Sequence, residues 1–206
     1  MSGKRVLSYV IGSNGAGKST LSRNVLGKDL VLHRNVYNKG CITESRYDIF
    51  PRTRETVVAV GRYTSQCGGV DTVKPLSDAY RIGLLAGEMF PEANIFMESL
   101  LMSGLFSSPL KFLLEMKYNG FDVEICFLFA TLRESMRRVF GRNGGIPIKP
   151  SCVENKLNAT VRNFSKIMAL GEFRGISIDT TKLSPEDVFL KFRKWSGLYE
   201  KNDRTA

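Results

Sequence analysis

The sequence lacks any long apolar segment. Its two longest uncharged runs, Val6–Gly17 and Ser99–Leu110, have 12 residues each, whereas a helix that spans a bilayer needs about 20 apolar residues. The basic start of the chain is superficially similar to a signal peptide, but the apolar run that follows continues into glycines without a cleavage site. We therefore expect no membrane partner and interpret Arg5–Ile11 as a strand.

Cysteines are few and are not spaced for metal or redox chemistry. No pair among the four has C-x-x-C spacing, which argues against zinc and dithiol sites and favours reduced thiols in a cytosolic setting. The four are Cys41, Cys67, Cys126 and Cys152.

Acidic residues are outnumbered, 20 against 30 basic ones, which gives a net charge of +10 and a pI of about 9.6. With 43% apolar and 24% charged residues, the chain has a globular rather than a disordered composition. The window from Arg133 to Arg174 alone contributes +6. Either the protein is simply basic, or it binds a polyanion, for which nucleic acid is the leading candidate.

Short β-branched runs alternate with helical patterns, which predicts an α/β fold with a five-stranded parallel sheet and helices on both faces. We expect one domain over residues 1–206. The predicted strands are Arg5–Ile11, Thr56–Val60, Asn94–Met97, Asp122–Phe129 and Gly175–Ile178. The predicted helices are Lys18–Leu26, Pro75–Met89, Pro109–Tyr118, Leu132–Phe140, one that opens at a capping box on Ser151, and one capped by Ser184–Asp187. Residues 29–55 match neither pattern and are interpreted as an insertion.

The strongest motif is a phosphate-binding loop. Gly12–Ser19 fits G-x-x-x-x-G-K-[ST] at every fixed position, between a predicted strand and a predicted helix. Its glycines let backbone N–H groups surround an anion, and the helix N-terminus adds a positive dipole end. The residues expected to hold a nucleoside triphosphate are Gly12, Ser13, Asn14, Gly15, Ala16, Gly17, Lys18, Ser19 and Thr20.

Within this loop, Lys18 is expected to reach the β and γ phosphates, and Ser19 to coordinate Mg²⁺. A nearby acid is also needed for the metal. Glu98 follows the strand Asn94–Met97 and is the candidate, although aspartate is commoner at such a position.

Other triphosphate-binding classes lack their markers. No N-K-x-D guanine motif is present, since Asn38–Cys41 departs from it, and no ABC-type signature segment occurs. A motor ATPase would usually be longer. A small phosphotransferase, with a P-loop nucleoside-triphosphate hydrolase/kinase fold, fits best.

Such enzymes close an arginine-bearing lid over the triphosphate, which excludes water and stabilises the transferred charge. The region 131–150 is the expected lid. Arg133 and Arg137 share one helix face and Arg138 and Arg142 another. We expect Arg138 and Arg142 to be the catalytic pair, with Lys149 as a further candidate.

Phosphorylation of a hydroxyl also calls for a carboxylate that accepts its proton. Asp71 follows Gly68-Gly69, where we expect a ligand to approach the backbone closely at the carboxyl edge of the sheet. Asp71 is therefore the predicted general base, and Asp48 is the second choice.

Taken together, the loop Gly12–Thr20, Gly61–Tyr63, Gly68–Thr72, the arginine helix and Ile178–Thr181 resemble the bacteriophage P-loop kinases that act on hypermodified DNA, among them the 5-hydroxymethyluracil DNA kinase. The resemblance spans most of the chain. It implies phosphorylation, by ATP and Mg²⁺, of the base hydroxymethyl group in DNA, with Lys18, Ser19 and Asp71 in the family's roles, and a location in the host cytoplasm.

The sequence does not identify how DNA is held, and two other functions stay open. Aromatic residues between arginines are candidates for base stacking, namely Tyr37, Tyr47, Phe50 and Tyr63 among Arg34, Arg46, Arg52 and Arg62. A kinase of free nucleosides or nucleotides, or a DNA-binding accessory that only hydrolyses the triphosphate, would use the same loop. The segment Asp179–Thr181 is a positional guess for the adenine pocket.

Overall fold

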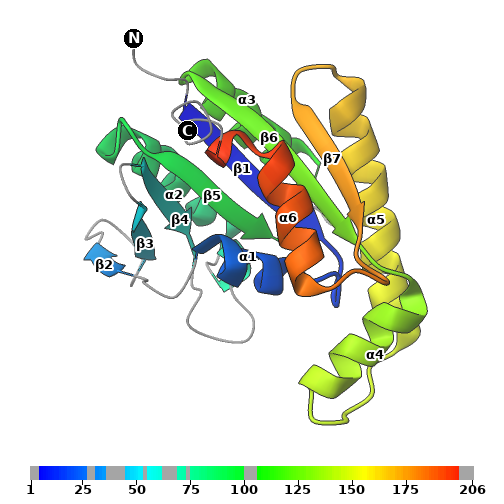
Figure 1. The fold of residues 1–206 in the computed structure, drawn as a ribbon. Coiled ribbons are helices and arrows are strands. Elements are labelled where there is room, and N and C mark those ends of the chain that lie inside the picture. The colour runs from blue at the N-terminus through cyan, green and yellow to red at the C-terminus, as the bar shows by residue number, and fades with distance from the viewer. Residues whose placement is uncertain are drawn as a thin grey trace.

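The computed structural model describes residues 5–26, 31–35, 45–52, 55–61, 69–72, 75–99 and 106–199. Its strands form one sheet in the order β2-β3-β4-β5-β1-β6-β7 (Figure 1). β1 (Arg5–Gly12) lies between β5 (Asn94–Ser99) and β6 (Phe121–Phe129), and both pairings are parallel. β4 (Glu55–Val60) and β7 (Arg174–Asp179) add further parallel strands on the two sides. The five predicted parallel strands are confirmed.

Two strands of the sheet were not predicted. Residues 29–55, interpreted as an insertion, contain β2 (Val31–Asn35) and β3 (Ser45–Arg52). β3 pairs antiparallel with β4, and β2 pairs antiparallel with β3, so this segment widens the sheet to seven strands. The sequence did not predict them because charged residues interrupt the apolar alternation that marks a strand.

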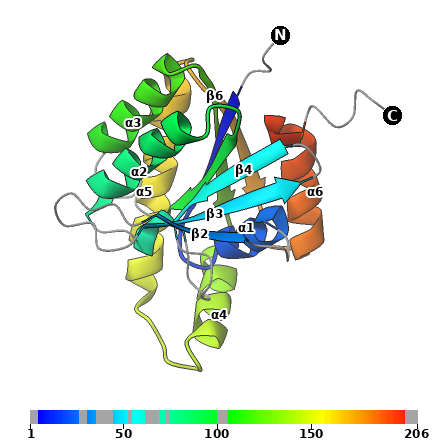
Figure 2. The same cartoon turned by 90° about the vertical axis from the view of Figure 1, so that its left-hand side faces the viewer.

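Helices cover both faces of the sheet, as predicted (Figures 1 and 2). α1 (Lys18–Leu26) and α6 (Pro185–Trp195) pack on one face around Val10, Phe96 and Leu128. α2 (Leu76–Met89), α3 (Ser107–Tyr118) and α5 (Pro150–Ala169) pack on the other. Since successive residues of a strand face opposite sides, buried residues of β1 contribute to both cores.

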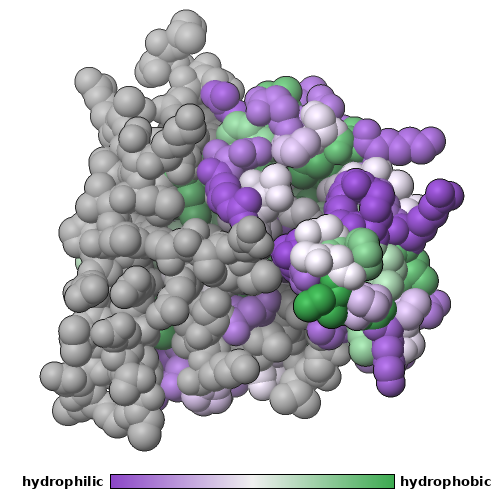
Figure 3. Space-filling model, turned by 90° about the horizontal axis from the view of Figure 1, so that it is seen from below, coloured by the Kyte–Doolittle hydropathy of each residue, from purple (hydrophilic) through white to green (hydrophobic). Residues whose placement is uncertain are grey.

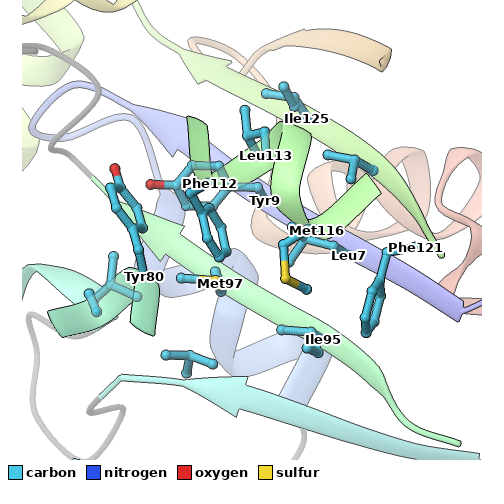
Figure 4. Packing of buried hydrophobic residues seen from close by; sticks show 14 of the residues in the cluster. Leu7, Tyr9, Tyr80, Ile95, Met97, Phe112, Leu113, Met116, Phe121 and Ile125 are labelled. Carbon is cyan, nitrogen blue, oxygen red and sulfur yellow. The ribbon is translucent and has the colours of Figure 1, made fainter. Parts of the chain in front are cut away.

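The core beneath α2 and α3 is the larger of the two. Figure 4 shows Leu7, Ile95 and Met97 of the central strands packed beside Phe112 and Met116 of α3. Burial on both faces explains why the central strands read as continuous apolar runs.

α4 (Leu132–Arg142) extends from the end of the sheet and connects to α5 through residues 143–149 (Figures 1 and 2). It is two residues longer than predicted, so the expected loop Gly141–Pro150 is shorter. The predicted capping box on Ser151 is wrong. Pro150 takes the first helical position of α5, and Lys149 precedes it without a side-chain cap, because proline already has the φ of a helix and needs no N–H partner there.

The last helix begins as predicted. Ser184 Oγ accepts a hydrogen bond from the Asp187 N–H, and the Asp187 carboxylate accepts one from the Ser184 N–H. The two bonds form a capping box. Across the described part of the chain, no helix combines the length and apolarity that crossing a bilayer requires.

Candidate active site

The predicted phosphate loop joins β1 to α1 at the carboxyl edge of the sheet. The Ala16 N–H donates to the Ser13 carbonyl at 3.3 Å, which closes the loop. The Gly17 carbonyl accepts from the N–H groups of Thr20 and Leu21 at 3.1 and 2.9 Å, which opens α1. The N-terminus of α1 therefore faces the loop, as anion binding requires.

The three loop glycines are needed for different reasons. A Cβ on Gly12 would lie 2.4 Å from the Leu128 carbonyl oxygen, and one on Gly15 would lie 2.5 Å from that of Ser135 on α4. Gly17 has a φ of 93°, but a Cβ there would have no neighbouring atom within 4 Å. The first two glycines thus allow the protein's own strands and helices to approach, whereas Gly17 leaves space beside the start of α1.

Lys18 lies over this loop. Its ammonium donates to the carbonyls of Gly12 at 3.0 Å and Ser13 at 3.2 Å. The cation is thereby held at the edge of the sheet, where a phosphate group bound to the loop would meet it.

Glu98 lies beside the loop serine. It is 1% exposed and belongs to β5, in register with Val10 of β1. Ser19 Oγ donates to Glu98 Oε1 at 3.0 Å, and Ser22 Oγ donates to Oε2 at 2.8 Å. Burial raises the pKa of Glu98, and Lys18 and the two serine hydroxyls oppose that rise.

The Ser19 hydroxyl and the Glu98 carboxylate are suitable ligands for Mg²⁺. The hydroxyl and the carboxylate are oxygen donors, which this ion prefers, and it commonly uses one or two protein oxygens together with substrate phosphates. Among the described residues no cluster of three or more histidine, cysteine or acidic side chains offers a fuller cage. Ser19 and Glu98 would hold the ion, and a bound cation would favour the ionised form of Glu98.

Asp71 lies on the other side of the end of β5. It belongs to a short 3-10 helix, Val70–Thr72, and its Oδ1 accepts from Ser99 Oγ at 3.0 Å. Because Glu98 and Ser99 are consecutive strand residues, they face opposite sides of the sheet. The two carboxylates are close enough that the charge of Asp71 raises the pKa of Glu98 slightly further.

The glycine ahead of Asp71 does not admit a ligand in the way we expected. Gly69 has a φ of 79°, and a Cβ there would lie 2.3 Å from Cγ of Glu98. The close neighbour is therefore the carboxylate of Glu98, and the glycine lets the Asp71 segment approach β5.

Arg138 connects α4 to the loop. Its guanidinium donates to the Gly15 carbonyl at 3.1 Å and to Oγ1 and the carbonyl of Thr180 at 2.9 and 2.7 Å. Glu134 accepts from its Nε at 2.7 Å. Of the predicted lid residues, Arg138 lies beside the phosphate loop.

The other basic residues of this region point to solvent. Arg133, Arg142 and Lys149 are exposed. Arg137 pairs with Glu134 at 2.6 Å, and the hydrogen bonds and charges of Arg137 and Arg138 lower the pKa of this half-buried carboxyl to about 2. Figure 3, which views the molecule from the α4 end, shows mainly hydrophilic side chains over the described part of this surface. The structure does not bring Arg142 to the loop, so its catalytic role stays a prediction.

A pocket of about 540 Å³ adjoins the loop. Its walls are the start of α1, the Glu134–Arg138 side of α4 and the segment from Thr180 to Pro185. Thr180 and Thr181 line it, whereas Asp179 does not, and the assignment of Asp179–Thr181 to an adenine pocket stays a prediction.

Sequence reasoning missed two supports of the site. Thr180 is 2% exposed and donates to the carbonyls of Ala16 and Phe129 at 3.2 and 3.1 Å, which ties β7 to the loop. Glu134 orients Arg138 from one turn earlier, and only this i, i+4 spacing signals it.

Several candidates have no described side chain. Tyr37, Arg62, Tyr63 and Gly68 lie outside the described residues. The remaining candidates are placed only along strands, with Arg34 on β2 and Arg46, Tyr47, Asp48, Phe50 and Arg52 on β3. Their predicted roles stay predictions.

Comparisons with known proteins bear on the fold. No family model matches the chain, and no curated protein sequence matches it. Among solved structures, a chain from the PezAT chromosomal toxin–antitoxin system of the human pathogen Streptococcus pneumoniae is similar, with a TM-score of 0.50 and 17% identity over 98% of this chain and 84% of that one. At this identity the likeness concerns architecture alone, namely an α/β fold with a central parallel sheet, and the phosphate-binding loop is assigned from this chain's own residues.

Proposed function

We propose that the protein is an ATP-dependent phosphotransferase that phosphorylates the hydroxymethyl group of 5-hydroxymethyluracil in DNA. The main support is one arrangement at the end of β5. Glu98 contacts the loop Ser19 on one side of the sheet, and Ser99 contacts Asp71 on the other. A candidate cation site and a candidate base therefore lie on the two sides of the end of β5.

The chemistry follows from these positions. Asp71 takes the proton of the acceptor hydroxyl, whose oxygen forms a bond to the γ-phosphorus while the bond to the β–γ bridging oxygen breaks and ADP leaves. Lys18 and Arg138 stabilise the charge on the phosphate oxygens. Mg²⁺, when bound by Ser19 and Glu98, neutralises charge on the phosphates.

The polymeric acceptor is supported by charge and by the sequence resemblance. Lys18 and the arginines of α4 account for only part of the +10, and a free nucleotide needs no basic surface beyond its pocket. Contacts between lysine or arginine and DNA phosphates release counterions, so the KM for DNA should rise steeply with salt while that for ATP changes little. The base must leave the stack to reach Asp71 if the substrate is duplex DNA.

Labelled ATP tests this proposal directly. The protein is incubated with DNA that contains 5-hydroxymethyluracil, with thymine DNA, and with free 5-hydroxymethyl-deoxyuridine monophosphate. We expect label only in the modified DNA. Label only in the free nucleotide would instead identify a small-molecule kinase, and release of phosphate without transfer would identify a hydrolase.

Asp71→Asn provides the matched variant. It should lower turnover more than it lowers ATP binding, because the amide keeps the size of the side chain but cannot accept the proton. Unchanged turnover in this variant would remove Asp71 as the base.

A further inference from the structure

Two buried hydroxyl groups near the candidate acceptor site have no role in the chemistry above. Tyr9 of β1 is fully buried, and Tyr80 of α2 is 6% exposed. Neither hydroxyl makes a hydrogen bond of regular geometry within the described structure, although the two lie near each other and Tyr9 lies near Ser99. Native proteins pair nearly all buried polar groups, so two adjacent exceptions call for an explanation.

Phe112 of α3 fixes the direction of both rings. It stacks on Tyr80 with centroids 4.8 Å apart and planes 12° apart, and it meets Tyr9 edge-on at 6.4 Å and 75°. Figure 4 shows the two hydroxyl oxygens near each other, pointing toward the end of the sheet to which β1 and β5 run. That is the edge where Ser99 and Asp71 lie.

Ser99 lies near Tyr9 as well as beside the candidate base. Its hydroxyl donates to Asp71, and it faces the α2 side of the sheet because Glu98 faces α1. Burial raises the pKa of Tyr9 to about 12; the Ser99 and Tyr80 hydroxyls oppose this, and the charge of Asp71 adds to it. Tyr9 is thus within electrostatic reach of Asp71.

We propose that Tyr9 and Tyr80 are positioning residues for the acceptor side, whose hydroxyls extend the Ser99–Asp71 hydrogen bond into the core and hold Asp71 in the orientation that accepts a proton. This inference rests on the proposed function for the role of Asp71. One bridging water is enough to join hydroxyls that lie close together but outside direct hydrogen-bond geometry.

Packing alone would favour phenylalanine at both positions. Phenylalanine has the same ring and buries no unpaired hydroxyl, so the two tyrosines cost stability. Proteins keep such costly groups where function requires them. If the hydroxyls have no functional role, removing them should leave kcat unchanged. If they position Asp71, removing them should lower kcat.

The test is Tyr9→Phe and Tyr80→Phe in the full chain, with DNA that contains 5-hydroxymethyluracil as acceptor. We expect an equal or higher Tm, unchanged ATP affinity and KM for DNA, and a kcat lowered about 10-fold, a loss smaller than that of a general base itself. Since Tyr9 acts through Ser99, Tyr9→Phe should cause no further loss in a Ser99→Ala background. A raised Tm with wild-type kcat would overturn the inference.

The matched control is Tyr118→Phe. Tyr118 ends α3 and is 91% exposed, so its hydroxyl should affect neither Tm nor kcat.

A second readout does not depend on transfer. The protein is labelled with 3-fluorotyrosine, and Tyr9→Phe identifies the ¹⁹F resonance of Tyr9. The chemical shift of this resonance should change in Asp71→Asn, and most of that change should be absent when Asp71→Asn is made in a Ser99→Ala background. The chemical shift of Tyr118 should not change. If the wild-type protein phosphorylates none of the acceptors, the proposed function fails, and this shift still tests the connection. An unmoved Tyr9 resonance overturns the inference whatever the activity.

Discussion

Two buried glutamates, Glu98 of β5 and Glu124 of β6, face the same side of the sheet in similar surroundings. They are 1% and 0% exposed, and the β1 residues in register with them, Val10 and Ser8, are two positions apart. Serine hydroxyls donate to both carboxylates, and burial raises the pKa of both. By burial and pKa alone, the two would be equal candidates for function.

Their other partners differ. Glu124 accepts from Ser8 and Ser196 at 3.0 and 2.9 Å and from the Gly197 N–H at 3.0 Å, and it pairs with Arg174 at 3.0 Å. These groups belong to β1, β7 and the end of α6, so the Glu124 carboxylate connects three elements of the fold and has a structural role.

Glu98 is bonded to Ser19 and Ser22 of α1, and the cation that opposes the burial effect is Lys18. Ser19 and Lys18 are the groups that a triphosphate would also engage. A shifted pKa therefore marks a candidate functional site only when the partners of the group can also contact a ligand.

The largest difference is expected when the cation beside each glutamate is removed. Lys18→Ala should lower phosphoryl transfer by about 10³-fold, because the charge on the phosphates loses a fixed cation, and should leave folding unchanged. Arg174→Ala should leave transfer unchanged and lower the free energy of unfolding by about 1–2 kcal/mol. Labelled-ATP transfer and chemical denaturation measure the two effects. Loss of transfer in Arg174→Ala would end the distinction between the two sites.

The next difference concerns the carboxylates themselves. Glu98→Gln should lower transfer by about 10²-fold and raise the Mg²⁺ concentration that transfer needs, since an amide oxygen is a weaker ligand. Glu124→Gln keeps the volume of the side chain and should transfer at the wild-type rate. A magnesium titration of both variants checks this, and equal rates in the two would remove Glu98 as a metal ligand.

A smaller effect is expected from the arginines that border the loop. Arg138→Ala should raise the KM for ATP or lower kcat by about 10-fold, because the bonds to Gly15 and Thr180 are charge-assisted. Arg133→Ala is the control, since Arg133 carries the same charge on the same helix but is exposed and does not line the pocket beside the loop. Steady-state kinetics with varied ATP measure KM and kcat for the two variants. An equal change in both variants would indicate disruption of α4 rather than loss of a contact with the loop.

The smallest expected effect is the pH dependence of stability. Because burial raises the folded-state pKa of both carboxyls, ionising either one costs folding free energy. This cost is absent below the unfolded pKa of 4.5 and grows as the pH rises from there toward the folded value. Each Glu→Gln variant should therefore have a higher Tm than the wild type at about pH 8, by about 2–4 °C.

These differences should converge toward zero at about pH 4, and thermal melts over this range measure them. Variants that melt below the wild type at about pH 8 would mean that the carboxylates stabilise the fold in their charged form.

Much of the site could be predicted because its elements are local in sequence. Strand, glycine loop and helix follow one another from Arg5 to Leu26, and each is specified by its own residues. Glu98 was predicted from the rule that the strand beside the loop strand ends in an acid, and the structure brings it to Ser19. Arg138 was predicted from spacing and lies at the loop, whereas Arg142, with the same charge one turn later, is exposed.

What could not be predicted depends on contacts between distant residues. Thr180 supports the loop from a position 164 residues away from Ala16, and no local pattern marks such a pair. The same holds for Ser99 with Asp71 and for the two tyrosine hydroxyls. β2 and β3 were missed because their pairing with β4 specifies them more than their own sequence does.

Glycine conformation, apolar periodicity and charge belong to individual residues, so the phosphate loop, the alternation of strands and helices and the excess of positive charge can be derived from the sequence. The contacts of Glu98 with Ser19, of Glu124 with Ser196 and of Ser99 with Asp71 depend on how distant segments pack. The physical reason is strand register, since side chains alternate between faces and a shift of one residue would exchange the neighbours of Glu98 and Ser99.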